Sequence, residues 1–371
     1  MKKTLLSLAV TLAAIQGVSA QEQQAPQALE LRPAQVSVLP GVGTNGKHGA
    51  RYYQPFSFNL LGGSNGGVNG FELGGILNVD KAFARGLQIG GVANLVGGPV
   101  RGVQVGGILN TSTDASGLQV GGIANIGTGN AKGAQIAGIT NIIKGEANGL
   151  QVAGIVNTAP QGVTGAQISG VINIAGKAKG LQLSTVNKAK VVRGLQLGVV
   201  NIADSAHATL GLVNIVRKNG YYRGEVWAGE TFFGNAAFKM GTKRLYTMLA
   251  LGWRQEDAIY HVAYGAGIGS ELGKVAGFTL SADLLSYQVS EDELWTDRST
   301  NQLQQVRLLA ARELKGNTAL LAGATFNVFE SSFTADGRER GMDIAPWHFY
   351  SKVHRNTRVT LWPGVNMGFR F

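Results

Sequence analysis

The sequence contains no cysteine, which excludes disulfide bonds, thiolate zinc sites, thiol catalysis and the lipidated cysteine of a bacterial lipoprotein. Only 8 prolines accompany 55 glycines, and the absence of a Gly-X-Y period excludes collagen. Hydrophobic residues make up 44% of the chain, which argues against intrinsic disorder. Beyond the first twenty residues no apolar run reaches the roughly 20 residues of a transmembrane helix, so any later membrane insertion would have to use strands.

The N-terminus has the pattern of a secretory signal peptide. Lys2 and Lys3 precede a short apolar run from Leu5 to Ile15, and the small residues Val18-Ser19-Ala20 follow. This predicts a signal peptide over residues 1–20 and an exported protein. The formal net charge of +11 then favours anionic lipid headgroups or polysaccharides over nucleic acid as partners, although solubility explains it equally well.

The mature chain is predicted to hold three further kinds of segment before the C-terminal region. Residues 21–50 are rich in Gln, Pro and Ala and read as a linker, and residues 51–69 as an initial strand or cap. Residues 70–216 repeat a GLQhGGhxN unit (h, hydrophobic), with copies at Gly70, Gly86, Gly102, Gly117, Gly133, Gly149, Gly165, Gly180 and Gly194. Such regular spacing indicates a repeat architecture.

A period of 14 to 16 residues is too short for helix-pair repeats, which need about 33 or more. In Leu87-Gln88-Ile89 the aliphatic residues alternate with Gln, as in a half-buried strand. One unit therefore predicts one coil of a β-solenoid, with aliphatic residues stacked inside and Gln and Asn stacked in ladders. Gly90-Gly91 could be a corner or strand interior. A ligand-binding role for the Gln and Asn is the weaker alternative, because stacked amides satisfy one another.

The turns between units carry a basic bias. Between residues 80 and 194 the acidic residues are Asp80, Asp114 and Glu146, whereas Lys81, Arg85 and Arg101 are joined by a set of candidate anion-binding residues: Lys132, Lys144, Lys177, Lys179, Lys188, Lys190 and Arg193. Stacked along one edge, these charges could contact anionic glycan or lipopolysaccharide, or simply keep the array soluble.

The composition changes at residues 217–371, where longer alternating segments predict an antiparallel β-barrel or barrel-like sheet. Eight strands are predicted at 221–231, 234–241, 244–254, 259–270, 276–288, 302–313, 317–329 and 357–371, with polar connections at 289–301 and 330–356. The last strand alternates an apolar face with a small or polar one, as an outer-membrane barrel requires. Its residues Val365, Met367, Phe369 and Phe371 resemble the C-terminal sorting signal that the barrel-assembly machinery recognises. A soluble edge strand is the alternative.

The combination of these segments resembles a known family. Val38-Leu39-Pro40-Gly41-Val42-Gly43, Phe56-Ser57-Phe58-Asn59-Leu60-Leu61-Gly62, the repeats, and Leu212 to Tyr221 are similar to exported surface-repeat proteins of Bacteroidota, which are uncharacterised. The resemblance covers nearly the whole mature chain. It implies an envelope location and a repeat architecture, and it implies no activity, cofactor or site residues.

Catalytic motifs are scarce, so no enzyme, cofactor or metal site is predicted. The five histidines are far apart, and Gly265-Ala266-Gly267-Ile268-Gly269 lies within an alternating strand, where it predicts close strand packing instead of a nucleotide loop. Asp283, Glu291, Asp292 and Glu293 could form an acid pair or cation site, or simply follow a strand. We therefore expect a non-enzymatic protein of the outer membrane or cell surface of a Gram-negative bacterium, with a structural or binding role. The alternative is a small outer-membrane channel or transporter in which the repeats form barrel strands.

Overall fold

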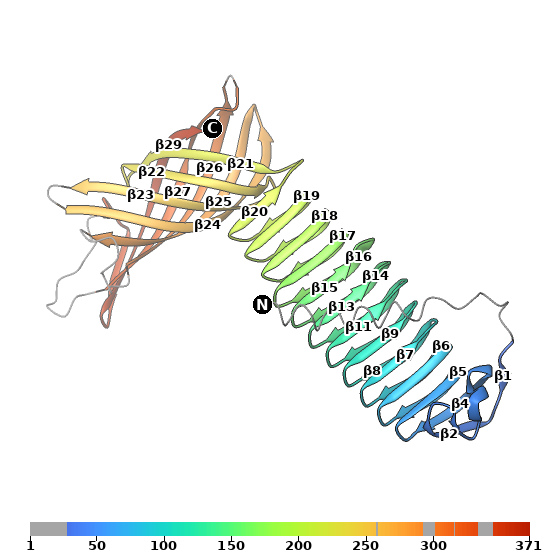
Figure 1. Cartoon of the computed structure of the whole chain (residues 1–371). Coiled ribbons are helices and arrows are strands. Elements are labelled where there is room, and N and C mark those ends of the chain that lie inside the picture. The colour runs from blue at the N-terminus through green and yellow to red at the C-terminus, as the bar shows by residue number, and fades with distance from the viewer. Residues whose placement is uncertain (1–27, 257–258, 292–300, 315, 333–343) are drawn as a thin grey trace, which may run out of the picture. The chain divides into compact units, whose positions relative to one another are not determined.

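The computed structural model describes residues 28–256, 259–291, 301–314, 316–332 and 344–371 (Figure 1). The predicted signal peptide lies outside these residues. The described chain is almost entirely β-structure: a β-solenoid of about 10 turns, followed by an antiparallel sheet. No described helix is long and apolar enough to cross a membrane. The chain divides into two compact units, with the boundary between Gly106 and Gly107.

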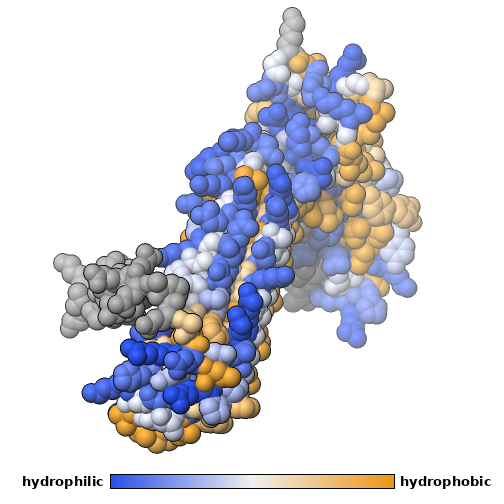
Figure 2. All heavy atoms as spheres, turned by 90° about the vertical axis from the view of Figure 1, so that its right-hand side faces the viewer, coloured by the Kyte–Doolittle hydropathy of each residue, from blue (hydrophilic) through white to orange (hydrophobic). Residues whose placement is uncertain are grey.

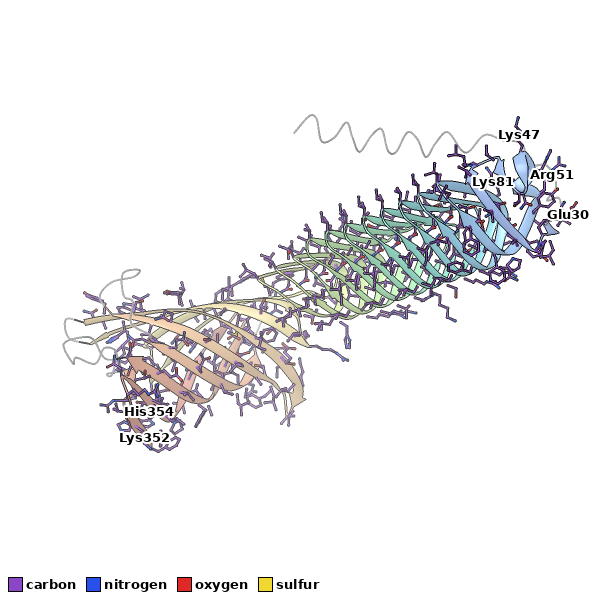
Figure 3. The ribbon with its side chains drawn as sticks, turned by 90° about the horizontal axis from the view of Figure 1, so that it is seen from below. Glu30, Lys47, Arg51, Lys81, Lys352 and His354 are labelled. Atoms are coloured by element: carbon purple, nitrogen blue, oxygen red, sulfur yellow. The ribbon has the colours of Figure 1, made fainter. Side chains whose placement is uncertain are left out.

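The first unit contains the N-terminal cap and the first repeats. Its elements are β1 (Glu30–Leu31), β2 (Ala34–Leu39), β3 (Val42–Gly43), the 3-10 helix η1 (Gly46–Arg51), β4 (Tyr52–Asn59), β5 (Gly62–Gly74), β6 (Leu77–Gly90), β7 (Ala93–Val96) and β8 (Val100–Gly106). The prediction of a linker over residues 21–50 is wrong for the described residues 28–50. There, β2 pairs in parallel with β4 and adds a strand to the N-terminal end of the stack of coils. Lys47 and Arg51 on η1 and Lys81 on β6 point away from the coils (Figure 3).

The second unit begins with the remaining repeats. Their strands are β9 (Leu109–Ser112), β10 (Ala115–Gly121), β11 (Ala124–Gly127), β12 (Ala131–Ala137), β13 (Thr140–Ile143), β14 (Glu146–Ala153), β15 (Val156–Ala159), β16 (Gly162–Ser169), β17 (Ile172–Leu183), β18 (Val186–Leu197), β19 (Val200–Leu210) and β20 (Val213–Val216). Equivalent residues of successive coils pair in parallel and in register, for example Gln135 with Gln151 and Asn141 with Asn157. The predicted stacking of one repeat on the next is thus confirmed.

The predicted position of the aliphatic side chains is wrong. The Gln and Asn of the repeats are buried, with at most 3% of each side chain exposed. Ile136, beside buried Gln135, is 40% exposed, and its equivalents also point outward. The interior is narrow and is filled by small residues, such as Ala131 and Ala147, together with the amides. A few larger aliphatic residues, such as Ile143 and Val163, are also buried there, but not those that alternate with Gln.

Buried amides are tolerated here because the coils satisfy one another. Asn141 Nδ2 donates to Asn157 Oδ1 in the next coil (2.9 Å) and to the backbone carbonyl of Val152 (2.8 Å). Gln151 Nε2 donates to Gln135 Oε1 in the preceding coil (2.9 Å). The two ladders therefore run in opposite directions. The same directions hold in the first unit, where Asn78 donates to Asn94 and Gln104 donates to Gln88.

Glycine occupies two special places in most coils, although Ser184 and Thr185 form the corner of the coil that begins at Gly180. The first glycine of the unit has a left-handed φ (Gly133, +115°), and a Cβ there would collide with the carbonyl of Gly117 in the preceding coil. The second is the corner between the two strands, where a Cβ on Gly138 would meet the carbonyl of Gly122. The Gly-Gly pair is thus a corner: β6 ends at Gly90, and β7 begins at Ala93.

The C-terminal strands form a closed barrel. They are β21 (Tyr221–Gly229), β22 (Gly234–Thr242), β23 (Leu245–Glu256), β24 (Ile259–Val275), β25 (Phe278–Glu291), β26 (Gln302–Glu313), β27 (Ala319–Ser332), β28 (Tyr350–His354) and β29 (Thr357–Arg370). The eight long strands pair antiparallel in sequence, and β29 returns to pair with β21. All eight predicted strands are confirmed. β28, which carries Lys352 and His354 (Figure 3), falls in a predicted connection and extends β29.

The repeats supply no strand to this barrel among the described residues, because the two parts form separate sheets. The alternative of repeats as barrel strands therefore does not hold. Residues 217–220 join the array to the start of β21, which pairs with the end of β22 at Gly241. The array is thus attached at the barrel end where the connections 243–244, 276–277 and 314–318 are short. The long connections, 292–301 and 333–356, are at the other end.

We predict that the buried amide contributes more to stability than its exposed aliphatic neighbour in the same coil. Asn141→Ala leaves the amide of Asn125 and the carbonyl of Val152 without their partner and should cost about 2 to 4 kcal/mol. Ile136→Ala, the matched control, should cost about 1 kcal/mol or less, because that side chain is half-exposed. Urea unfolding followed by circular dichroism measures both. A larger loss for Ile136→Ala would refute the amide-filled interior.

Candidate functional site

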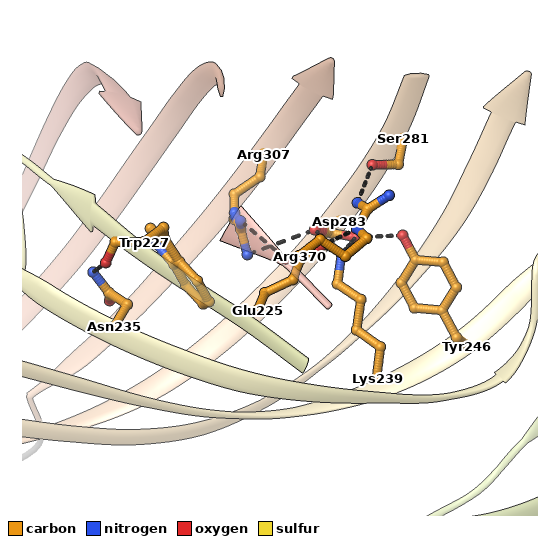
Figure 4. Close-up of polar contacts among 9 residues, drawn as sticks. All are labelled: Glu225, Trp227, Asn235, Lys239, Tyr246, Ser281, Asp283, Arg307 and Arg370. Atoms are coloured by element: carbon orange, nitrogen blue, oxygen red, sulfur yellow. Dashed lines mark hydrogen bonds and ion pairs between the residues drawn. The ribbon is translucent and has the colours of Figure 1, made fainter. Parts of the chain in front are cut away.

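Five charged side chains meet inside the barrel, each from a different strand (Figure 4). We call them the ion cluster: Glu225 on β21, Lys239 on β22, Asp283 on β25, Arg307 on β26 and Arg370 on β29. All occupy inward positions of their strands. The side chains of the first four are fully buried, and that of Arg370 is 5% exposed.

Each carboxylate of the ion cluster contacts more than one cation. Lys239 Nζ lies 2.8 Å from Glu225 Oε1 and 3.0 Å from Asp283 Oδ2. Arg370 Nε donates to Glu225 Oε1 (2.7 Å). Arg307 reaches both acids, at 3.4 Å from Glu225 Oε2 and 3.6 Å from Asp283 Oδ2. Three cations thus share two anions, so the ion cluster has a net formal charge of +1.

Neighbouring side chains fix the geometry of the ion cluster. Tyr246 Oη donates to Asp283 Oδ1 (2.7 Å), and Arg370 Nη2 donates to Ser281 Oγ (3.3 Å). The guanidinium of Arg307 lies 3.9 Å above the indole ring of Trp227, a cation–π contact. Buried charges are stable only when they are paired and hydrogen-bonded, and these contacts meet that requirement in part: Arg307 Nε and Nη1 are buried without a hydrogen-bond partner.

The glycines of β24 make room for this arrangement. Gly269 pairs with Asp283 in the register of β24 and β25, and a Cβ there would collide with the Asp283 carboxylate and the Tyr246 ring. Gly265 similarly makes room beside Tyr287. The prediction of close strand packing for residues 265–269 is therefore confirmed.

The remaining interior contains both apolar and polar groups, and Leu285, Leu303 and Leu321 belong to a buried hydrophobic cluster inside the barrel. At the short-turn end a cavity of about 210 Å³ is lined by charged residues, Arg223, Lys243, Glu271, Glu313 and Arg370 among them. Elsewhere in the barrel, buried polar atoms lack a protein partner: Tyr287 Oη, Trp362 Nε1, His261 Nδ1 and the side-chain amide of Asn366. Such atoms are costly in a dry apolar core, and two of the residues that carry them, Tyr287 and Trp362, belong to the hydrophobic cluster of the barrel interior.

Of the ion cluster, only Asp283 was predicted from the sequence, and for a different role. Asp292 and Glu293, its predicted companions, lie outside the described residues, as does the side chain of Glu291. A charged residue between two apolar neighbours in a strand could have indicated the others. Arg307, for example, lies between Val306 and Leu308, which point outward. Among the described residues, no group of three or more His, Asp or Glu is placed to hold a metal ion.

The predicted basic residues are exposed but do not all share one edge. Lys132, Lys179 and Arg193 occupy the same register position at the start of their long strands, and Lys179 pairs directly with Arg193. Lys188 instead pairs with Ile174 and Ile202 on the strands that carry Asn. Lys144 lies between β13 and β14. Lys177 lies within β17, two residues before Lys179, and Lys190 lies within β18, three residues before Arg193. The structure thus groups three of the seven into one row.

The predicted sorting residues lie on the outer face of the barrel. Val365, Met367, Phe369 and Phe371 are each more than half exposed, whereas Thr360, Trp362, Asn366 and Arg370 of the same strand are buried. The two predicted faces of the last strand are therefore confirmed, and recognition by an assembly machinery stays a prediction.

A second buried charge site lies in the first unit, where Glu72 replaces the usual Gln. Its Oε2 accepts from Gln88 Nε2 (2.7 Å) and its Oε1 from Asn65 Nδ2 (2.7 Å). Glu72 thus ends the Gln ladder with a group that only accepts. Asp80 is buried beside it and also accepts from Gln88. Burial, reinforced by the negative charge of Glu72, raises the pKa of Asp80 well above its usual range.

Comparisons with protein-family models, curated proteins and solved structures give no match to this chain. Function must therefore be inferred from geometry.

The excess positive charge of the ion cluster generates a prediction about its members. Glu225→Gln leaves three cations facing one anion, whereas Lys239→Met leaves two facing two, although both changes break the same 2.8 Å ion pair. We expect Glu225→Gln to destabilise the barrel by about 3 to 5 kcal/mol and Lys239→Met by clearly less. Urea titration followed by tryptophan fluorescence tests the order, which equal losses would contradict.

The buried acid pair of Glu72 and Asp80 should make the stability of the protein depend on pH. In the unfolded chain Asp80 loses its proton near its ordinary pKa of 3.8, whereas the folded protein holds that proton to higher pH. Stability is therefore lost as the pH rises above about 4, until the folded pKa is reached. Asp80→Asn should stabilise the protein at pH 7 and have little effect at pH 4. Thermal unfolding of both proteins at the two pH values tests this; an equal effect at both would show that Asp80 does not titrate differently on folding.

Proposed function

We propose that this protein is a non-enzymatic outer-membrane protein, in which the C-terminal barrel is a membrane anchor that carries the repeat array. The observation that carries the proposal is the inverted distribution of polarity in the barrel. The five charged residues of the ion cluster are buried inside, while Leu251, Leu308, Met367 and Phe369 on the outside are each more than half exposed. Figure 2 also shows hydrophobic residues gathered over part of the visible surface of the molecule. A membrane barrel requires this arrangement, and a soluble one does not tolerate it.

The filled interior favours an anchor over an open channel. Eight strands leave an interior that side chains can just fill, and here the ion cluster joins five strands across it. Its charges are paired and held by Tyr246 and Ser281. We therefore infer a structural or binding role for the protein, with the array presenting the binding surface.

The position of the array suggests which compartment it occupies. In outer-membrane barrels the short turns face the periplasm and the long loops face outward. The array joins the short-turn end, through residues 217–220. We accordingly infer that the array is periplasmic, which makes the inner leaflet and the periplasmic glycan its nearest anionic neighbours. This orientation disfavours lipopolysaccharide, which lies in the outer leaflet.

A charge placed on the outer face tests the anchor. Leu308 lies near the middle of β26, so Leu308→Arg should oppose insertion by about 2 to 4 kcal/mol. Gln302→Arg, at the loop end of the same strand, should cost about 0 to 1 kcal/mol and serves as the matched control. Insertion is measured by retention in membranes after carbonate extraction and by heat-modifiable gel mobility. Release of the unmodified protein by carbonate, without a mobility shift, would reject the anchor.

A further inference from the structure

The outside of the repeat array carries rows of aliphatic residues. In the second unit, one aliphatic residue per coil follows the corner glycine and is between 41% (Ile139) and 56% (Leu212) exposed. The stack is Ile108, Ile123, Ile139, Ile155, Val171, Val199 and Leu212, with Thr185 at the remaining coil. Backbone hydrogen bonds connect successive members, as from Ile139 N to the carbonyl of Ile123 (3.0 Å). Ile76 and Val92 occupy the same position in the first unit.

Rows on both sides of the corner continue this surface. On the long strands the neighbouring row is Val120, Ile136, Val152, Ile168, Leu183 and Leu197. On the short strands it is Leu109, Ala124, Thr140, Val156, Ile172, Val186 and Val200, of which Ala124 is buried. We call the corner row and these two rows of the second unit the aliphatic edge. It contains no charged residue, and it repeats with every coil, about 4.8 Å apart. Soluble monomers rarely expose continuous apolar patches beyond a few hundred Å².

Cations flank the aliphatic edge on the long-strand side. Lys132, Lys179 and Arg193 lie at the starts of the long strands whose far ends form the corner. An apolar surface bordered by Lys and Arg is the pattern of proteins that lie in a membrane interface, with aliphatic groups among the acyl chains and cations near the phosphates.

The aliphatic edge is continuous with the outer face of the barrel. Val199 and Leu212, from the last coils, line one apolar cleft of about 630 Å³ together with Leu249 and Ile268 of the barrel wall. Both barrel residues are more than a third exposed on the side proposed to face lipid. The junction is held by hydrogen bonds, from Asn214 Nδ2 to Thr247 Oγ1 (2.9 Å) and from Thr242 Oγ1 to the carbonyl of His207 (3.0 Å).

We propose that the aliphatic edge is a second membrane-contacting surface, and that its partner is the phospholipid leaflet on the short-turn side of the barrel. The choice of leaflet rests on the proposed function. The aliphatic side chains enter the interfacial region, and Lys132, Lys179 and Arg193 contact lipid phosphates. The array is thereby a monotopic element instead of a freely projecting stalk.

The absence of cysteine allows a direct test with single-cysteine variants of the full chain. Ile139→Cys, Lys132→Cys and Leu308→Cys place one environment-sensitive fluorophore on the aliphatic edge, the cation row and the barrel wall. The proteins are reconstituted into vesicles of phosphatidylethanolamine and phosphatidylglycerol, and quenching by lipid-borne nitroxide is compared with quenching by aqueous iodide. We expect the labels at residues 139 and 308 to be quenched several-fold more by the nitroxide lipid than the label at residue 132.

The three positions separate this inference from the anchor. Nitroxide quenching at residue 308 with iodide quenching at residue 139 would overturn the lipid contact and leave the anchor intact. Quenching by lipid at residue 139 alone would reject the anchor and keep the contact. A label at residue 139 shielded from both quenchers would mean that protein, such as a second copy, covers the aliphatic edge, which also overturns the proposal. Vesicles of phosphatidylcholine alone should weaken the nitroxide effect at residue 139, because they lack net negative charge.

Discussion

The hydrogen bonds between stacked side-chain amides determine most other features of the repeat array. An Asn amide that donates to the next coil and accepts from the previous one needs the two coils in register, because a shift of one residue would bury it without partners. Asn141 illustrates this, with Asn125 on one side and Asn157 on the other. The close approach of the coils then demands glycine at the corner, where a Cβ on Gly138 would strike the preceding backbone. The regular spacing of Gln, Asn and Gly in the repeats thus has a single cause, the close stacking of coils in register.

Filling the interior with amides has a consequence for the outside. The residues that alternate with Gln in a strand must point outward, and in this sequence they are aliphatic, as with Ile136 beside Gln135. The barrel shows the same inversion in a stronger form, since Arg307 is buried between outward-facing Val306 and Leu308. Both parts therefore bury hydrogen-bonding or charged groups and carry apolar side chains outside, although each interior also holds buried hydrophobic residues, such as Leu285 in the barrel and Val163 in the array. Because both have apolar outer surfaces, we propose that the aliphatic edge and the outer face of the barrel contact lipid.

Much of this architecture could be predicted from the sequence, because it depends on periodicity. The repeat period gave the solenoid, and alternation gave the eight barrel strands and the two faces of the last one. The direction of the alternation in the repeats could not be predicted in the same way. Hydrophobic burial alone places Leu87 and Ile89 inside, and only the hydrogen bonds between stacked amides reverse that choice.

The ion cluster was missed for a related reason: Glu225 and Arg370 are distant in sequence, and only the pairing of β21 with β29 brings them together. The strand β2 in the expected linker was missed although Gln35, Val36, Ser37 and Val38 alternate between polar and aliphatic residues; its pairing with β4 shows that it continues the coils.

The ends of the ladders explain two residues that depart from the repeat. A ladder of donors needs a final acceptor, and the Gln and Asn ladders need theirs at opposite ends because they run in opposite directions. Glu72, whose carboxylate can only accept, stands at the N-terminal end of the Gln ladder. The Asn ladder ends at Asn214, which donates to the hydroxyl of Thr247 in the barrel. The barrel thus satisfies the last amide of the array, so the junction between the two is part of the same hydrogen-bonded system. Because the ladders oppose one another, their amide dipoles also oppose, and the array avoids building up charge at either end.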